Sequence, residues 1–366
     1  MVDTVQTGDA RSDLAEMDLA ALENAVAARG YPRFHGRQIF SWIHRHGVTD
    51  PEEMSNLPAE LRATVAAAFR LTTPKILSRD RSSDGTEKFL LELADHRRIE
   101  SVFIPDTPGM TFCVSTQVGC AMACAFCLTG KMGLLRNMTA GEIVGQVRVL
   151  AAATGLQSSA FNIVLMGMGE PLHNYDETMK ALRILADEHG MAVPMRRITL
   201  STVGVLPALE RLGHEPLMPN LAVSLHAPTD AQRGVLVPLN RKYGVEDIIA
   251  ACKRFPVKRR SRITFEYVLL AGVNDSVADG RKLASLLTGI KAKVNVIPLN
   301  PAPGIPFDRP SDAVIDRFAK TLAERGVVVS VRKSRGRDIR AACGQLIVEG
   351  RLDSPAQRLA TIAFQS

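Results

Sequence analysis

Apolar residues recur at helical spacing in the first part of the chain. They lie three or four positions apart in stretches between Leu19 and Phe69, separated by Gly30-Tyr31-Pro32 and by Val48-Thr49-Asp50-Pro51. This spacing puts the apolar side chains on one face of each helix, and glycine and proline end helices. The pattern predicts a small helical domain over residues 16–75. Residues 1–15 are polar and show no period, which predicts a disordered terminus.

Shorter apolar runs rich in β-branched residues follow. The segments 88–93, 99–104 and 111–117 are bounded by turn-forming residues, so 76–110 is predicted to be a β-rich extension. From Cys113 onward such runs alternate with helical patterns, at 161–166, 197–202, 221–225, 263–270, 294–299 and 327–331. This alternation predicts an α/β fold over 111–350, a partial (β/α)6 barrel of about six units around a parallel sheet. Residues 351–366 are predicted to be a C-terminal tail or helix.

Cysteine and polar residues follow several of these strands directly. The carboxyl ends of barrel strands form one face, where such barrels carry out their chemistry, so these residues are expected to lie together. They are Cys120 after the first strand, Gly169 and Glu170 after the second, Ser201 after the third, His226 after the fourth and Asn300 after the sixth.

Composition and charge narrow the class of protein. With 366 residues, 46% of them hydrophobic, the chain can bury a large core. Its net charge of +7 favours a polyanionic partner but by itself does not identify one. No apolar run reaches the roughly 18 residues of a membrane span, and the N-terminus shows no signal sequence. A cytoplasmic protein without a membrane partner is therefore expected.

The cysteines are placed for metal chemistry. Six cysteines are too few for a disulfide scaffold in a chain this long. Cys120, Cys124 and Cys127 are close enough for one loop to hold a metal centre, but no His or Cys follows nearby to complete a zinc site. Three thiolates suit a [4Fe–4S] cluster with one iron open to a substrate. The alternative is three buried structural cysteines, and Cys252, in an amphipathic stretch, is expected to be buried without a role.

The spacing C-x3-C-x2-C, with Phe126 before the last cysteine, resembles the signature of the radical S-adenosylmethionine (SAM) superfamily. Met168-Gly169-Glu170-Pro171 resembles the glycine-rich SAM site of that superfamily. The resemblance implies that the open iron binds SAM and that an electron from the cluster splits it into methionine and a 5′-deoxyadenosyl radical. It also implies SAM contacts at the strand ends, where strand capping is the alternative role. These residues are Gly169, Glu170, Ser201, Ser224, Leu225, His226 and Asn300.

Within the superfamily, the chain from its helical part through Gln345 resembles the RlmN/Cfr family of RNA adenine methyltransferases. The blocks that carry the resemblance are 33–40 (RFHGRQIF), 115–120 (STQVGC), Arg136-Asn137 with Glu142-Ile143, and 341–346 (AACGQL). The resemblance implies that Cys343 is methylated and supplies the carbon, that Cys113 frees the enzyme from its product, and that Glu100 accepts a proton. It also implies that the helical domain is an RNA-binding accessory domain.

The chemistry explains why a cluster and two more cysteines are needed. An adenine C2 or C8 carbon is electron-poor and cannot attack the methyl group of SAM. In the implied reaction one SAM methylates Cys343, and a second gives the radical that removes hydrogen from the S-methyl group. The methylene radical adds to the ring. Loss of the ring proton and attack by Cys113 on the Cys343 sulfur then free the base and leave a transient disulfide.

The resemblance implies methylation of adenine C2 in the peptidyl-transferase region of 23S rRNA and in the tRNA anticodon loop. It also implies an electron donor such as flavodoxin with flavodoxin reductase, and a monomer is expected. One alternative is a Cfr-like enzyme that methylates C8 in rRNA with the same residues. Another is a non-catalytic iron–sulfur RNA-binding module, which the presence of Glu170, Cys113 and Cys343 disfavours.

Two basic runs are candidates for RNA contact. The run 253–262 is equally well explained by a solvated basic face, whereas the run 332–337 shortly precedes the last cysteine. Arg335, Arg337 and Arg340 would favour the thiolate of that cysteine if they converge on it. The target base must reach a thiol inside a barrel mouth, so it is expected to be unpaired or flipped out of its stack.

Overall fold

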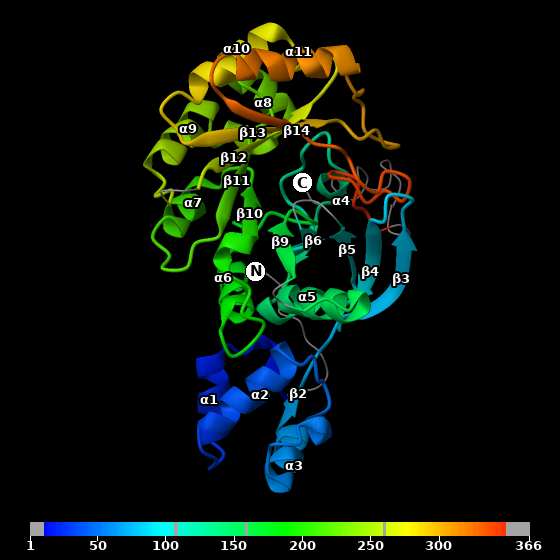
Figure 1. The fold of residues 1–366 in the computed structure, drawn as a ribbon, viewed down its shortest axis with the longest axis vertical. Coiled ribbons are helices and arrows are strands. Elements are labelled where there is room, and N and C mark those ends of the chain that lie inside the picture. The colour runs from blue at the N-terminus through cyan, green and yellow to red at the C-terminus, as the bar shows by residue number, and fades with distance from the viewer. Residues whose placement is uncertain (1–10, 106–108, 158–159, 259–260, 349–366) are drawn as a thin grey trace, which may run out of the picture.

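The structure, a computed structural model, describes residues 11–105, 109–157, 160–258 and 261–348. Three helices make up most of its N-terminal part, as the helical periodicity predicts, and Figure 1 shows them together at one end of an elongated molecule. Ile39 and Phe40 are completely buried among them. The helices are α1 (Leu19–Ala27), α2 (Phe34–His44) and α3 (Ala59–Ala68).

The start of this part differs from the prediction of a disordered terminus over 1–15. Residues 12–16 form a short strand, β1 (Ser12–Asp13), and a 3-10 turn. β1 pairs in parallel with β2 (Phe69–Arg70), and Leu14 is only 1% exposed. The prediction is wrong for these residues because the strand partner lies far along the chain, where local periodicity does not reach. Residues 351–366 lie outside the described residues, and the predicted domain boundaries stay predictions.

A mixed ten-stranded sheet forms the body of the molecule, in the order β14-β13-β12-β11-β10-β9-β6-β5-β4-β3. Neighbouring strands from β14 to β6 are parallel, and those from β6 to β3 are antiparallel. β14 is an edge strand of this sheet, so the barrel is open on that side. The strands are β3 (Lys75–Arg81), β4 (Glu87–Glu92), β5 (Arg98–Ile104), β6 (Met110–Cys113), β9 (Phe161–Leu165), β10 (Ile198–Thr202), β11 (Asn220–Ser224), β12 (Ile263–Leu269), β13 (Ala292–Pro298) and β14 (Val328–Val331).

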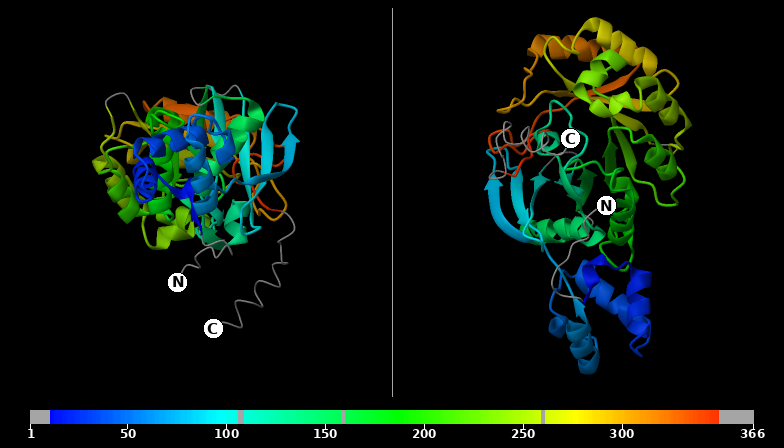
Figure 2. Two further views of the ribbon diagram at one scale, coloured as in Figure 1. Left: turned by 90° about the horizontal axis from the view of Figure 1, so that it is seen from below. Right: turned by 180° about the vertical axis from the view of Figure 1, so that it is seen from behind.

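Helices alternate with the parallel strands and cover the outside of the sheet (Figures 1 and 2). None of the described helices is long and apolar enough to cross a membrane. The predicted α/β class, a partial (β/α)6 barrel with an N-terminal helical part, is confirmed. The helices are α4 (Leu128–Met132), α5 (Ala140–Thr154), α6 (Tyr175–Ala186), α7 (Leu206–Leu212), α8 (Asp230–Leu236), α9 (Val245–Arg254), α10 (Val277–Leu286) and α11 (Asp312–Ala323).

The predicted strand 111–117 is two strands in the structure. β6 ends at Cys113, and β7 (Gln117–Gly119) turns away to pair with β8 (Leu134–Asn137). Gly119 permits the close crossing, because its φ is +82° and a Cβ there would lie 1.9 Å from the Gly133 carbonyl oxygen. The residues across the break, Val114, Ser115 and Thr116, include no glycine or proline that would mark a turn, so the sequence predicts a single strand.

Polar contacts join the helical part to the barrel. The Glu16 carboxylate accepts a hydrogen bond from the Gly141 N–H (3.0 Å) and another from the Thr139 hydroxyl, at the amino end of α5. A carboxylate is stabilised there by the helix dipole and by unpaired N–H groups. Arg45, which directly follows α2, donates a hydrogen bond to the carbonyl of Gly190, a residue just beyond α6 (3.3 Å). The helical part is thus fixed to the outer helices of the barrel.

Candidate active site

The cluster loop, residues 120–127, lies between β7 and α4 at the carboxyl end of the barrel. The Cys120 N–H donates to the Gly133 carbonyl (2.9 Å). α4 packs so closely that a Cβ on Gly130 would lie 2.9 Å from the Cys124 backbone nitrogen. Cys120, Cys124 and Cys127 all line one cavity of about 920 Å³, which we call the cluster cavity.

The three thiols are withdrawn from solvent. Burial raises the pKa of the Cys120 thiol to about 12, and it raises the pKa of Cys124 and Cys127 as well. Repulsion from neighbouring thiols adds to the rise for Cys120 and Cys124. Thiolates at these positions therefore need positive charge among them, as the irons of a cluster provide.

Glu170 follows β9 and lines the same cavity. Its two oxygens accept backbone hydrogen bonds from Leu172 (3.1 Å) and Val203 (2.9 Å). Burial raises the pKa of this carboxyl to about 7, against the opposing effect of those hydrogen bonds. Gly169 has a φ of +103°, and a Cβ there would lie 2.6 Å from the Gln117 Cβ, so the position requires glycine. A buried carboxylate of this kind suits an ammonium group.

The other predicted SAM residues lie at neighbouring strand ends. Ser201, Ser224, His226 and Asn300 line the cluster cavity together with Gly169 and Glu170. The hydroxyls of Ser201 and Ser224 lie 3.4 Å apart. Leu225 does not line the cavity, because its side chain is completely buried in the core. Any contact from Leu225 would have to come from its backbone.

His226 has an unusual backbone conformation and a fixed ring. Its φ is 62°, in the left-handed region. The ring Nδ1 accepts a hydrogen bond from the Val268 N–H (3.1 Å), and the ring meets Phe126 of the cluster loop edge-on at 4.7 Å. Burial lowers the pKa of His226 to about 3, with the charge of Arg233 contributing. The ring therefore stays neutral near pH 7.

Cys343 lies between the cluster loop and the end of β6. Burial raises the pKa of Cys113 to about 12, and Cys343 adds to that rise. Cys343 likewise contributes to the raised pKa of Cys127. Arg332 supplies positive charge near these two cysteines. Its pKa is raised most by Cys343 and less by Glu266 and Cys113, whereas burial lowers it. Cys113 and Cys343 are both free thiols.

The Cys343 segment, residues 332–347, contains no helix or strand and is held by side chains. Its Gly344 has a φ of +81°, and a Cβ there would lie 3.2 Å from the Phe126 carbonyl oxygen. Hydrogen bonds run from Asn300 Nδ2 to the Cys343 carbonyl (3.2 Å), from Thr129 Oγ1 to the Leu346 carbonyl (2.7 Å) and from Gln345 Nε2 to the Pro301 carbonyl (3.0 Å).

Glu100 lies on β5 and contacts the same segment. Its carboxylate accepts a hydrogen bond from the Ile347 N–H (2.8 Å) and pairs with Lys88 Nζ (2.9 Å). It is 3% exposed. It lines neither the cluster cavity nor a second, wider cavity that Cys343 also borders. The structure thus places this predicted proton acceptor against the backbone beyond Cys343, and not in a cavity wall.

Comparisons with known proteins agree with this arrangement. Residues 114–282 match the model of the radical SAM superfamily, and residues 12–71 match the ribosomal RNA large subunit methyltransferase N-terminal domain. The chain is 45% identical to the dual-specificity RNA methyltransferase RlmN of Anaeromyxobacter dehalogenans over 96% of each protein. It is 46% identical to that of Acidiphilium cryptum over 93% of this chain and 90% of the relative. The chain belongs to the RlmN family.

A solved structure supports the same assignment. A radical SAM methyltransferase from Sphaerobacter thermophilus is 49% identical, with a TM-score of 0.86, over 92% of this chain and 99% of that one. The predicted radical SAM fold and the predicted enzyme class, a SAM-dependent RNA methyltransferase, are confirmed. Members of this family use a [4Fe–4S] cluster and SAM, as predicted.

The residues of the cluster cavity fit such a cofactor pair. Three thiols line the cavity beside a buried carboxylate and a row of hydroxyl and amide groups. Within the described ranges, no group of three or more His, Cys, Asp and Glu side chains is placed to hold a single metal ion. A mononuclear zinc site would gather its ligands around one ion, whereas a cluster binds each thiolate to a different iron.

Two buried polar residues of the site were not predicted. Arg233 on α8 is completely buried and donates to the carbonyls of Leu225 (3.0 Å) and Val203 (2.6 Å), so it fixes two strand ends below the cavity. The Gln117 side-chain oxygen Oε1 accepts a hydrogen bond from the Glu170 backbone N–H (2.8 Å). The sequence carries no local signal for Arg233, because only the structure shows that Arg233 is buried on α8 while Val235 is 65% exposed.

The basic run 332–337 only partly follows the prediction. Arg332 lines the cluster cavity with Cys343, whereas Arg335 donates to the Asp84 carbonyl (3.4 Å). Arg337 and Arg340 are exposed. The Asp84 carboxylate also accepts a hydrogen bond from the Gly336 N–H (2.9 Å). Arg335 and Arg337 therefore do not line the cluster cavity beside Cys343.

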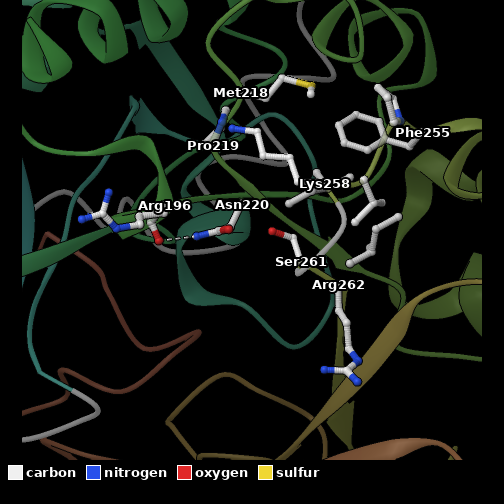
Figure 3. A pocket seen from close by; sticks show the side chains of 12 residues that line it. Arg196, Met218, Pro219, Asn220, Phe255, Lys258, Ser261 and Arg262 are labelled. Carbon is white, nitrogen blue, oxygen red and sulfur yellow. Dashed lines mark hydrogen bonds between the residues drawn. The ribbon is translucent and has the colours of Figure 1, made fainter.

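The basic run 253–262 lies at the opposite end of the barrel. Lys258 and Arg262 border a pocket with Arg196 and Phe255 at the amino ends of β10, β11 and β12 (Figure 3). Figure 3 shows the charged ends of Arg196, Lys258 and Arg262 pointing in different directions, so they do not form a single anion site. Residues 259 and 260 lie outside the described residues. This run is remote from Cys343, and its contact with RNA stays a prediction.

Proposed function

We propose that this chain methylates C2 of an adenine in 23S rRNA and in the tRNA anticodon loop. The relatives are named dual-specificity RNA methyltransferases. The observation that carries the proposal is the position of Cys343, which lines the cluster cavity with Cys127 and whose charge raises the pKa of both Cys127 and Cys113. A carbon carried on Cys343 can therefore be formed beside the cluster and released by Cys113.

In this proposal the strand ends bind the cofactors. Cys120, Cys124 and Cys127 hold the cluster, which when bound supplies the electron that splits SAM into methionine and a 5′-deoxyadenosyl radical. Glu170, beside Gly169, accepts hydrogen bonds from the methionine ammonium. The remaining contacts to SAM come from Ser201, Ser224, the Leu225 backbone, His226 and Asn300.

Cys343 carries the methyl group. It attacks the methyl carbon of a first SAM as a thiolate, and Arg332 lies beside it to balance the negative charge. A second SAM per turnover supplies the radical that removes one hydrogen from the S-methyl group. The methylene radical on Cys343 then adds to adenine C2. The base must be unpaired or flipped out of its stack to reach this position.

Release requires Glu100 and Cys113. Glu100 is the proposed acceptor of the ring proton, and its contact with the Ile347 N–H ties it to the Cys343 segment. The one unpaired electron of the adduct would return to the oxidised cluster, which makes the step redox-neutral. Cys113 then loses its proton and attacks the Cys343 sulfur, an S–S bond forms, and the C–S bond breaks. The departing carbon takes up a proton to become the methyl group. The disulfide must be reduced by an external thiol before the next turnover.

The proposal includes two further partners. A low-potential electron donor such as flavodoxin with flavodoxin reductase would reduce the cluster, and the enzyme would act as a monomer. The Cys343 segment carries Lys333 and Arg337 on its exposed side, where they are available to RNA phosphates.

The two thiols give the sharpest test. Cys343→Ala should cleave SAM reductively but form no methylated RNA and carry no S-methyl group. Cys113→Ala should be methylated on Cys343, add to adenine and stop there, because nothing is left to attack the Cys343 sulfur. The measurements are a denaturing gel before and after ribonuclease treatment and peptide mass spectrometry of the Cys343 segment.

The product of the unaltered enzyme completes the test. Nucleosides from RNA treated with reconstituted enzyme should contain 2-methyladenosine, and 8-methyladenosine would contradict the proposed position. If Cys113→Ala turns over without an adduct and Cys343→Ala also remains active, the carrier mechanism is wrong for this protein.

A further inference from the structure

Glu266 is a buried carboxylate with one unused oxygen beside Cys343. It lies on β12, is 4% exposed, and its Oε1 accepts a hydrogen bond from Asn295 Nδ2 (3.0 Å). Its Oε2 is buried and has no hydrogen-bond partner in the described part of the chain. Asn295 is itself held by the Ser330 hydroxyl (2.5 Å). A buried carboxylate oxygen without a donor is costly, so Oε2 is placed to receive one from a ligand.

The surroundings of Glu266 place that ligand near the methyl carrier. Glu266, Arg332 and Cys343 line both the cluster cavity and a second, wider cavity that extends across the inner faces of the strands toward the open side of the barrel. The wider cavity therefore offers a route from solvent to Cys343. Its polar lining near Glu266 comes mainly from Asn295, Ser330 and Lys293.

Arg332 lines the same two cavities as Cys343 and Glu266. Its pKa is raised most by Cys343 and also by Glu266, and its charge in turn lowers the pKa of Glu266 against the effect of burial. The Glu266 Oε2 has no hydrogen-bond partner among the described residues. The cavity wall that holds Cys343 thus offers a ligand both an acceptor, Glu266, and a donor, Arg332.

An acceptor and a donor beside the methyl carrier suit one edge of adenine. Along its Watson–Crick edge adenine presents C2–H, then ring N1 as an acceptor, then the N6 amino group as a donor. Carboxylates only accept hydrogen bonds and guanidinium groups only donate them. Guanine has the opposite polarity, with an N1–H donor and an O6 acceptor, and carries an amino group on C2.

We propose that Glu266 and Arg332 read the Watson–Crick edge of the target adenine, with Glu266 Oε2 accepting from the N6 amino group and Arg332 donating to N1. The inference rests on the proposed C2 methylation and adds the residues that select the base. A flipped base is generally recognised through this edge. Neither residue was identified as a site residue from the sequence, since Glu266 lies within a strand of otherwise mostly apolar residues.

The test combines a variant with a modified RNA. In Glu266→Gln the side-chain oxygen should keep the Asn295 hydrogen bond and turn the NH2 group toward the ligand, so the polarity at that point is reversed. The substrates are transfer RNAs that carry adenosine, purine riboside without the N6 amine, or 7-deazaadenosine at the target position. The control variant is Thr321→Val, on α11 and outside both cavities.

For the unaltered enzyme, kcat/KM should fall by at least about tenfold when the N6 amine is removed. On adenosine RNA, Glu266→Gln should lower kcat/KM by about the same factor. On purine RNA, its kcat/KM should differ from that of the unaltered enzyme by less than about threefold. Replacement of N7 should have little effect, because N7 is not on the edge that is read. Thr321→Val should behave like the unaltered enzyme with every RNA.

Three results would overturn the inference. Equal losses of Glu266→Gln on adenosine and purine RNA would show that the amine is not its partner. Weaker binding of SAM to Glu266→Gln in the absence of RNA would show that Glu266 contacts SAM. If Glu266→Gln rapidly forms a covalent RNA adduct that is not released, Glu266 would instead be the proton acceptor. Failure of the proposed function is seen separately, as a product other than 2-methyladenosine from the unaltered enzyme on adenosine RNA.

Discussion

The cluster loop and the Cys343 segment present thiols to the same cavity but are built differently. The cluster loop is enclosed by β7, β8 and α4, where Gly119 and Gly130 leave no room for a side chain. The Cys343 segment has no regular structure. It is held by side-chain hydrogen bonds from neighbouring elements and by a backbone hydrogen bond from the Leu128 N–H to the Gly344 carbonyl (2.9 Å). Ligands of a cluster need fixed positions, whereas the proposed methyl carrier must meet SAM, a base and Cys113 in turn. The difference in construction suits these different tasks.

The largest effect is expected in the cluster loop. Changing Cys120, Cys124 or Cys127 to Ala should abolish both the brown chromophore and SAM cleavage, because each thiolate binds its own iron. Iron and sulfide analysis of anaerobically reconstituted protein should give about four of each per unaltered chain. The control is Cys252→Ala, a buried cysteine on α9, which should keep the cluster. Stoichiometric zinc without iron in freshly purified protein would contradict the prediction.

The tight packing of the cluster loop can be tested without removing a thiol. Gly119→Ala should lower the iron content to about half or less, because the new methyl group would collide with the Gly133 carbonyl. Gly155→Ala is the matched control, since Gly155 also has a positive φ (+66°) but no atom within 4 Å of an added Cβ. Both variants share the conformational cost of roughly 1 kcal/mol. Equal iron contents in the Gly119→Ala and Gly155→Ala variants would show that the cluster loop can shift to accommodate the added methyl group.

A smaller effect is expected in the Cys343 segment. Gln345→Leu removes the hydrogen bond to the Pro301 carbonyl and should slow methylation by about fivefold, the equivalent of roughly 1 kcal/mol. Cluster content and SAM cleavage without RNA should not change. Thr321→Val deletes a comparable bond on the remote α11 (2.8 Å to the Arg317 carbonyl) and should leave methylation unaltered. A loss of iron in Gln345→Leu would mean that the two regions are not independent.

The smallest effect concerns RNA affinity. Changing Arg335 and Arg337 to Ala should weaken RNA binding and lower its salt slope by about one per lost phosphate contact. Lys258→Ala with Arg262→Ala, at the amino ends of the strands, is the comparison and should change the slope less. Filter binding over a series of salt concentrations measures both. A larger change of the salt slope in the Lys258 and Arg262 variant would place the RNA at the amino ends of the barrel strands.

Much of this site could be predicted from local sequence. The alternation of strands and helices predicted the barrel and its active end, and the spacing of three cysteines predicted one cavity wall. Predictions failed where a long-range contact decided the structure. The alternating pattern at 111–117 hid the break after Cys113, and the early polar residues became ordered only through their pairing with β2.

The sequence by itself determined the fold class, the family and the identity of the cysteines, because periodicity and motif spacing are local properties of the chain. The tertiary structure alone decided which cation meets Cys343 and which carboxylate faces the cavity. Arg332, not Arg335 or Arg337, lines the cluster cavity with Cys343, and Glu266 has the unused oxygen. These relations depend on the register of β12, β13 and β14, whose residues Glu266, Asn295 and Ser330 are aligned by the sheet although they lie far apart in the chain.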